Sequence, residues 1–138
     1  MPFDASTIPL LSLIRLPFQF TGEPYAIQRW FLLLAHESGK AMCIKVTSKG
    51  TKYKNSPFHS DGWAWFAPAE IACLPKETAF QTENFFEIPH TYIRLVQSTG
   101  DLSVEPSIAD CKARVHAAVD KSRRLSGQEK ARLKAWLT

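Results

Sequence analysis

The chain has few cysteines and no long apolar run. Cys43, Cys73 and Cys111 are far apart and form no CxxC pair, so neither a structural zinc site nor a disulfide framework is expected. No apolar segment approaches the roughly 20 residues that a membrane helix needs. No basic segment precedes an apolar one at the N-terminus, so a secretory signal is not expected. Together these features predict a cytoplasmic protein with free thiols.

Short motifs of the common enzyme classes are also missing. The sequence contains no glycine-rich phosphate loop, no GxSxG nucleophile elbow and no HExxH zinc motif. The four histidines lie in four different predicted elements, without the spacing of metal ligands: His36, His59, His90 and His116. We therefore expect no metal and no cofactor.

The composition fits one folded domain whose positive charge is concentrated near the C-terminus. The chain has 138 residues, of which 45% are hydrophobic and 22% charged, which is typical of a globular protein. Its net charge is +4, but residues 112–134 hold eight Lys or Arg and two acids, so that segment carries +6 and the remainder −2. Either this basic tail binds nucleic acid or an acidic protein, or it is a solvated helical face. We expect a β core over about residues 10–97 and a helical extension over about 105–138.

The clearest local pattern is a hairpin. Ile27–His36 (IQRWFLLLAH) is an apolar strand, and Glu37–Lys40 has the chemistry of a tight turn. Apolar and polar residues alternate over the next segment, Ala41–Ser48. This pattern predicts two antiparallel strands.

The remaining elements complete a small β-rich fold. Further strands are expected at Leu10–Leu16, Trp63–Phe66, Ile71–Leu74 and Tyr92–Val96, with turns over residues 75–84. Helices are expected over 106–122 and 127–137, because Ser107 with Asp110 and Ser126 with Glu129 resemble capping boxes. Short strands followed by helices favour a small antiparallel barrel with two C-terminal helices over a βαβ sheet.

The open end of the hairpin is expected to bring an arginine close to two hydroxyl side chains. Counting outward from the turn places Arg29 near Thr47 and Ser48. An arginine fork donates two hydrogen bonds to phosphate oxygens, and a hydroxyl can position one of those oxygens. The alternative is a surface arginine near an ordinary strand end. Lys49, Lys52 and Lys54 follow, with Tyr53 between the last two.

The order of these segments resembles a known family. Arg29-Trp30, the strand FLLLAH, a turn, the strand AMCIKV and Thr47-Ser48 look like the PemK/MazF-like toxins. The resemblance covers roughly residues 10–120, and its sharp part spans about 25 residues. Trp30 departs from it, because the family usually has proline there.

The resemblance implies an SH3-like barrel, a dimer and a metal-independent endoribonuclease, the hydrolase of a type II toxin–antitoxin system, held inactive by a cognate antitoxin. It implies that Arg29 stabilises charge on the phosphorane during attack by a ribose 2′-hydroxyl, and that Thr47 and Ser48 orient a phosphate oxygen. His59 is a candidate for proton transfer. Lys49, Lys52, Lys54 and Tyr53 would bind single-stranded RNA. The second hypothesis is a non-catalytic SH3-like module, of phage or mobile-element origin, that binds protein or nucleic acid.

Overall fold

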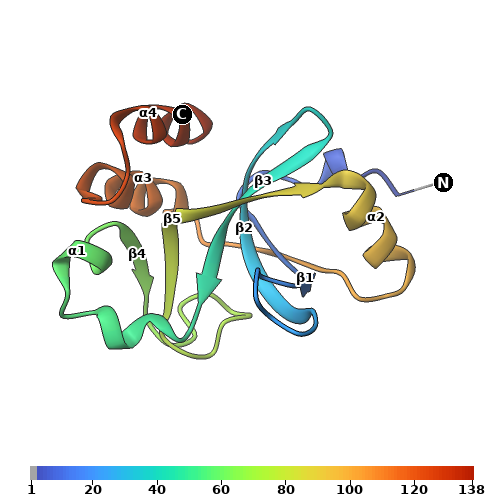
Figure 1. Cartoon of the computed structure of the whole chain (residues 1–138), viewed down its shortest axis with the longest axis horizontal. Helices are drawn as coiled ribbons and strands as arrows, with labels where there is room; N and C mark the ends of the chain where they lie inside the picture. The colour runs from blue at the N-terminus through green and yellow to red at the C-terminus, as the bar shows by residue number, and fades with distance from the viewer. Residues whose placement is uncertain (1–2) are drawn as a thin grey trace.

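A six-stranded antiparallel sheet organises the chain (Figure 1). The computed structural model describes residues 3–138, except for the side chains of Thr51, Lys52 and His59. The spatial order of the strands is β4-β5-β3-β2-β1-β6. Their bounds are Ser12–Phe18 (β1), Ile27–Glu37 (β2), Lys40–Thr47 (β3), Trp63–Phe66 (β4), Thr78–Pro89 (β5) and Ser103–Pro106 (β6). The described strands form an open sheet with β4 and β6 at its edges, so they give a β-rich fold with helices but no hydrogen-bonded closure.

Short helices fill the connections and longer ones follow the strands. The helices are η1 (Ala5–Thr7), η2 (Gly50–Tyr53), α1 (Pro57–Ser60), α2 (His90–Ser98), α3 (Cys111–Lys121) and α4 (Gly127–Trp136). The predicted capping box at α4 is confirmed: Ser126 accepts from the Glu129 backbone, and the Glu129 side chain accepts from the Ser126 backbone. The predicted cap of α3 is wrong. Its helix begins at Cys111, and Asp110 at the N-cap makes no side-chain capping bond.

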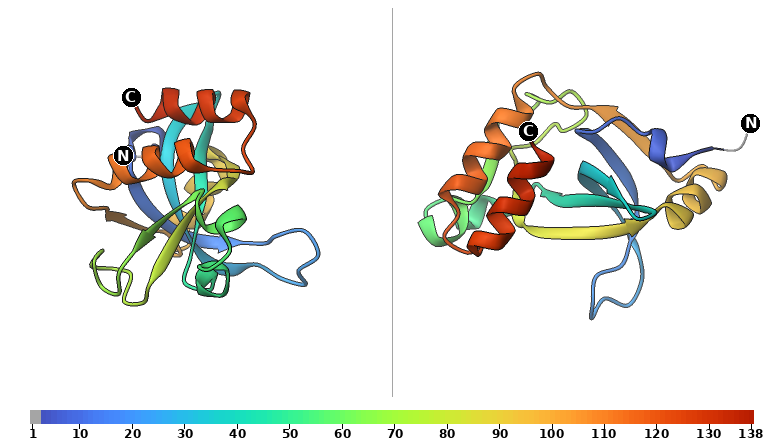
Figure 2. Two further views of the ribbon diagram at one scale, coloured as in Figure 1. Left: turned by 90° about the vertical axis from the view of Figure 1, so that its left-hand side faces the viewer. Right: turned by 90° about the horizontal axis from the view of Figure 1, so that it is seen from above.

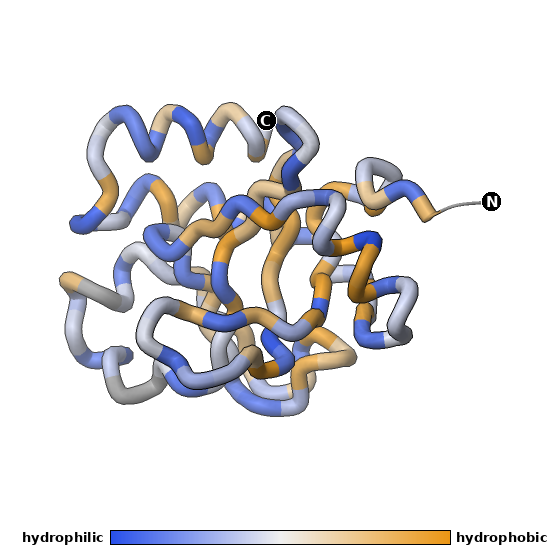
Figure 3. The backbone as a smooth tube through the Cα atoms, turned by 45° about the vertical axis from the view of Figure 1, so that its right-hand side comes forward, coloured by the Kyte–Doolittle hydropathy of each residue, from blue (hydrophilic) through white to orange (hydrophobic). Residues whose placement is uncertain are grey.

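Two apolar clusters lie on opposite faces of the sheet, because successive strand residues point to opposite sides. One contains Leu32, Ile44 and Phe80 together with Val115 of α3 and Leu133 of α4. The other contains Phe31, Cys43 and Ile88 with Ile93 of α2 and Ile8 beside η1. Figure 2 shows α3 and α4 over one end of the sheet, with α2 near the other. In Figure 3 the strands form an apolar centre, while α3 and α4 alternate polar and apolar turns.

Three segments differ from their sequence-based prediction. The expected turn region 75–84 contains the start of β5, and the expected strand Tyr92–Val96 belongs to α2. The polar residues at 81–84 favoured a turn over a strand in the sequence-based prediction. In the structure they belong to β5, and Gln81 and Thr82 are buried. In α2, Ile93 and Val96 are buried at a spacing of three, which suits a helix, whereas β-branched content alone favours a strand. The expected strand Ile71–Leu74 is also wrong, because this segment forms turns.

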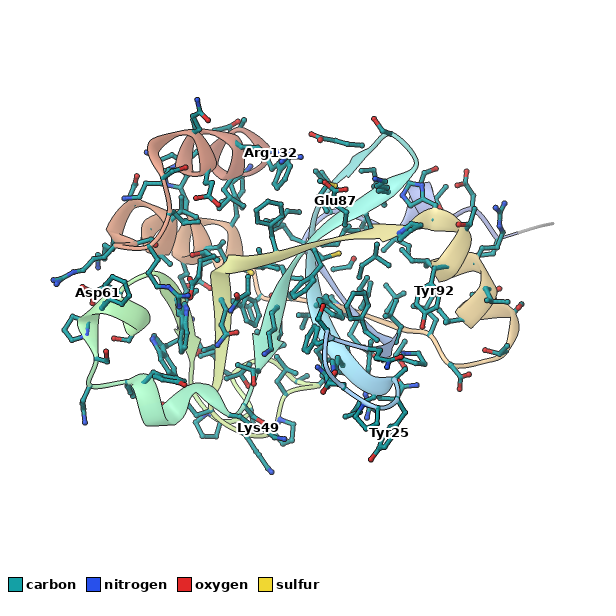
Figure 4. The ribbon with its side chains drawn as sticks, viewed as in Figure 1. Tyr25, Lys49, Asp61, Glu87, Tyr92 and Arg132 are labelled. Carbon is teal, nitrogen blue, oxygen red and sulfur yellow. The ribbon has the colours of Figure 1, made fainter. Side chains whose placement is uncertain are left out.

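The basic tail is held against acidic residues, many of them from the β core. The ion pairs are Arg114–Glu70 (2.5 Å), Arg123–Asp61 (3.3 Å), Arg124–Glu83 (3.2 Å), Arg132–Glu37 (3.7 Å) and Lys134–Asp120 (2.5 Å). Figure 4 shows Arg132 on α4 and Asp61 beside α1. Much of the +6 charge therefore meets acids within the fold, which favours a docking role for these cations over a free basic face.

Among residues 3–138, no helix is both long enough and apolar enough to cross a membrane.

Candidate functional site: a cationic hollow at the open end of the hairpin

The hollow forms because two neighbouring strands end at different places. The predicted hairpin is confirmed: β2 and β3 pair from Glu37↔Lys40 to Trp30↔Val46. Beyond that last pair, β3 stops at Thr47, while β2 continues with β1 as far as Phe18↔Ile27. The flank of β2 at residues 27–29 is therefore left without a β3 partner. Arg29 and Thr47 lie just beyond the last pair, one on each strand.

Residues of both strands and of the β1–β2 connection line this space, which has a volume of about 430 Å³. We call it the Arg29 hollow. Its lining comprises Arg15, Phe20, Glu23, Ile27, Gln28, Arg29, Trp30, Lys45, Val46, Thr47, Ser48 and Lys49. Four of these side chains are cationic (Arg15, Arg29, Lys45 and Lys49) and one, Glu23, is a carboxylate. The hollow is thus electropositive, as a phosphate site must be. Figure 2 shows the β1–β2 connection projecting from the body of the fold.

Arg29 is largely buried, with 17% of its side chain exposed. Its guanidinium lies 3.9 Å from the centroid of the Phe20 ring and donates from Nη2 to Glu23. The buried Nε has no acceptor among the described residues. A buried donor without a partner is costly, so Arg29 retains capacity for an anionic ligand.

Glu23 connects the projecting loop to Arg29. Its Oε1 accepts from the Phe20 backbone N–H at 2.7 Å. This hydrogen bond, together with the Arg29 guanidinium, holds the pKa of Glu23 below its usual value. The carboxylate is therefore ionised at neutral pH, and it fixes the loop that carries Phe20 over the hollow.

Lys45 lies on the same face as Arg29 and Thr47. It pairs with Phe31, and residues two apart on a strand point the same way. Its ammonium lies 4.9 Å from the Phe20 ring centroid. Burial lowers the pKa of Lys45, and the charges of Arg29 and Lys49 lower it further against the opposing effect of Glu23. An anion bound here would relieve that repulsion.

Thr47 and Ser48 shape the turn that leaves β3. The Thr47 Oγ1 accepts from the Lys49 backbone N–H at 3.1 Å. A Cβ added at Gly50 would lie 3.1 Å from the Trp63 ring and 3.6 Å from Thr47 Cγ2, so glycine lets the chain pass closely over the sheet. This packing fixes Thr47, Ser48 and Lys49 at the rim.

The predicted site residues do not all meet. Arg29, Thr47, Ser48 and Lys49 line one hollow, and Figure 4 shows Lys49 where β3 ends. Lys54 instead pairs with Glu77 at 2.5 Å and lies 5.5 Å from the Trp65 ring centroid.

Tyr53 also lies on the β4 side of the fold, with its ring 5.7 Å from that of Trp63. The predicted side chains of Lys52 and His59 lie outside the described residues. The backbone of residue 59 belongs to α1, whose Ser60 carbonyl accepts from Trp65 Nε1 at 3.3 Å.

Sequence reasoning missed Phe20, Glu23, Lys45 and Arg15. Lys45 carried a usable signal, because it is a charged residue inside an otherwise apolar strand two positions before Thr47. Phe20 and Glu23 come from a loop whose path depends on tertiary contacts, so no local pattern placed them.

A second polar cluster lies near η1. His36 Nδ1 and His90 Nε2 are 2.9 Å apart, and His36 Nε2 is 2.9 Å from the Ile8 carbonyl oxygen. Burial, then the neighbouring His36, lowers the pKa of His90. The pair joins the β2–β3 hairpin, α2 and the N-terminal segment. Within the described part of the chain, no group of three His, Cys, Asp or Glu side chains could hold a metal ion.

No protein-family model matches the chain, and no curated protein sequence matches it significantly.

Proposed function

We propose that the protein binds single-stranded RNA in the Arg29 hollow and cleaves it without a metal, as the toxin of a type II toxin–antitoxin pair. The observation that carries this proposal is the convergence of Arg29, Thr47 and Ser48 on one cationic hollow. The resemblance of the hairpin to PemK/MazF-like toxins supports the same function, and with it an SH3-like barrel.

The residues suit cleavage by the neighbouring ribose 2′-hydroxyl. In that reaction a new bond forms between the 2′-oxygen and phosphorus, and the bond to the 5′-oxygen breaks. Arg29 would stabilise the charge on the phosphorane, and the Thr47 and Ser48 hydroxyls would orient a non-bridging oxygen.

Proton transfer needs an acceptor for the 2′-proton and a donor for the 5′-oxygen. Glu23 is the ionised carboxylate of the hollow and is our candidate acceptor, although its low pKa makes it a weak base. Lys45 is our candidate donor, since its ammonium lines the hollow and burial, with the nearby charges of Arg29 and Lys49, lowers its pKa. His59 remains a candidate on sequence grounds.

A purified-protein assay tests this function. Wild type should cleave single-stranded RNA in the presence of EDTA, leaving a 2′,3′-cyclic phosphate and a 5′-hydroxyl. Arg29→Ala should lower kcat/KM by about 100- to 1000-fold, the effect typical of losing one donor to a developing oxyanion. Arg94→Ala is the matched control, since Arg94 is exposed on α2. Intact RNA across a wide range of conditions would refute the proposal.

The partners follow from the same surface. We propose a cognate antitoxin with an acidic segment, because such a segment would complement the four cations of the hollow. We also propose a homodimer, as the resemblance implies. Growth arrest on expression, relieved by Arg29→Ala or by the product of an adjacent small reading frame, would support the toxin assignment.

A non-catalytic binding module is the second candidate, and one observation favours it. Arg29 already donates to Glu23, so a phosphate must compete with that carboxylate. A module that binds RNA through Lys45, Lys49 and Arg15 would not need Arg29 to be free. Tight RNA binding without cleavage, unaffected by Arg29→Ala, would identify it.

A further inference from the structure

A second hollow adjoins the first at the turn that ends β3. Its volume is about 210 Å³, and its lining is Trp30, Val46, Thr47, Ser48, Cys73, Leu74, Pro75, Lys76 and Thr78. We call it the Trp30–Pro75 hollow. The Arg29 hollow shares Trp30, Val46, Thr47 and Ser48 with it. One turn and one aromatic side chain therefore border both spaces.

The two hollows differ in chemistry. The Arg29 hollow holds four cations, whereas the Trp30–Pro75 hollow is lined mainly by apolar groups with Lys76 as its charged residue among those described. Burial raises the pKa of Cys73, so this thiol stays neutral and acts as an apolar wall. The Thr78 hydroxyl donates to the Lys76 carbonyl oxygen at 2.8 Å, so it is already engaged.

Trp30 can offer an aromatic face to the second hollow. The indole is partly buried, and the Arg15 guanidinium lies 5.9 Å from its ring centroid. Arg15 lines the Arg29 hollow, while Trp30 lines both. Every nucleobase has a π-face, so an aromatic side chain beside a phosphate site stacks bases with little sequence preference.

We propose, on the basis of the RNA function above, that the Trp30–Pro75 hollow holds the base of a nucleotide that adjoins the phosphate bound in the Arg29 hollow, stacked against Trp30. Charge complementarity selects this occupant: a ligand that spans both spaces must be anionic at one end and flat and apolar at the other. A nucleotide has both parts joined at short range. We expect this hollow to bind a base by stacking rather than by hydrogen bonds to its edge, because its walls carry few free donors and acceptors.

The test uses a short RNA whose cleavage point has been mapped, and variants in which one nucleotide at a time is replaced by an abasic residue. With wild type, the abasic replacement on one side of the cleaved phosphate should lower kcat/KM roughly tenfold, within the range for loss of one stacked base. Trp30→Leu, which keeps apolar bulk but removes the aromatic face, should cause a similar loss on intact RNA. On the abasic RNA it should cause almost none. Trp30→Phe should retain most of the activity.

The outcomes separate this subsite from the proposed function. If wild type neither binds nor cleaves RNA, both fail. If it cleaves RNA but Trp30→Leu loses the same factor on intact and abasic substrates, the function stands and the base subsite is refuted. If Trp30→Leu leaves the cleavage of intact RNA unchanged, the base subsite is refuted while the proposed function stands. The abasic series with wild type needs no substitution, so the absence of any abasic effect beside the cleaved phosphate refutes the base subsite even if Trp30→Leu does not fold, and Trp30→Phe then tests the aromatic contact.

Discussion

Lys45→Met should make the protein more stable and a poorer ligand for RNA. Lys45 is half-buried between Arg29 and Lys49, and burial and their charges lower its pKa. Methionine keeps an unbranched side chain of similar length and removes the charge. Its thioether can replace the 4.9 Å contact of the ammonium with the Phe20 ring, a ring that Arg29 already covers at 3.9 Å.

The expected gain is about 0.5–1 kcal/mol, at the low end for surface-charge optimisation because Lys45 is still partly solvated. With an unfolding entropy of about 2.1 cal/mol/K per residue, a chain of 138 residues gains about 3 °C in Tm for each kcal/mol. Urea titration at neutral pH and a thermal melt both measure the change.

RNA affinity should fall in the same variant. Removing one phosphate contact reduces the magnitude of the negative slope of log K against log salt by about 0.7 for a single strand. A titration of fluorescent RNA at several salt concentrations, with an uncleavable 2′-deoxy substitution at the cleavage point, measures that slope.

Lys40→Met on the same strand is the matched control. Lys40 pairs with Glu87 at 3.0 Å, and both side chains are over 40% exposed, so its loss should change stability by less than about 0.5 kcal/mol. If Lys45→Met has a lower Tm than Lys40→Met, repulsion from Arg29 and Lys49 does not destabilise the protein. If Lys45→Met keeps the wild-type salt slope, Lys45 does not contact RNA phosphate in the hollow.

Two further predictions concern other parts of the fold. Deleting residues 127–138 should lower the free energy of unfolding by several kcal/mol, since buried Leu133 and Leu137 leave the core. The deletion should not change the salt dependence of RNA binding. A flatter slope of log K against log salt would show that α4 binds phosphate directly. Stability should also fall as pH drops from about 6.5 toward the lowered pKa of His90, because the unfolded chain takes up that proton first. His90→Gln should flatten this part of a pH series of urea midpoints, and an unchanged decline would assign it to other groups.

Local chemistry was enough to predict the hairpin and the last helix. The strand 27–36, its turn and the alternation after Lys40 fixed β2 and β3, because a buried strand and its register follow from the apolar pattern. Ser126 and Glu129 fixed the start of α4 through a capping box that needs only neighbouring residues. The same hairpin count placed Arg29 beside Thr47 and Ser48.

Tertiary structure decided the rest. Whether Tyr92–Val96 became a helix or a strand depended on where Ile93 and Val96 could be buried, and β5 runs through polar residues that only the folded sheet makes internal. The acids that receive the basic tail come from distant segments, such as Glu37 and Glu83. The hollow itself exists because β3 stops before β2 does and a distant loop brings Phe20 and Glu23 over the gap. Sequence alone determined which residues meet along the hairpin, whereas contacts between distant segments determined the space around them and its charge.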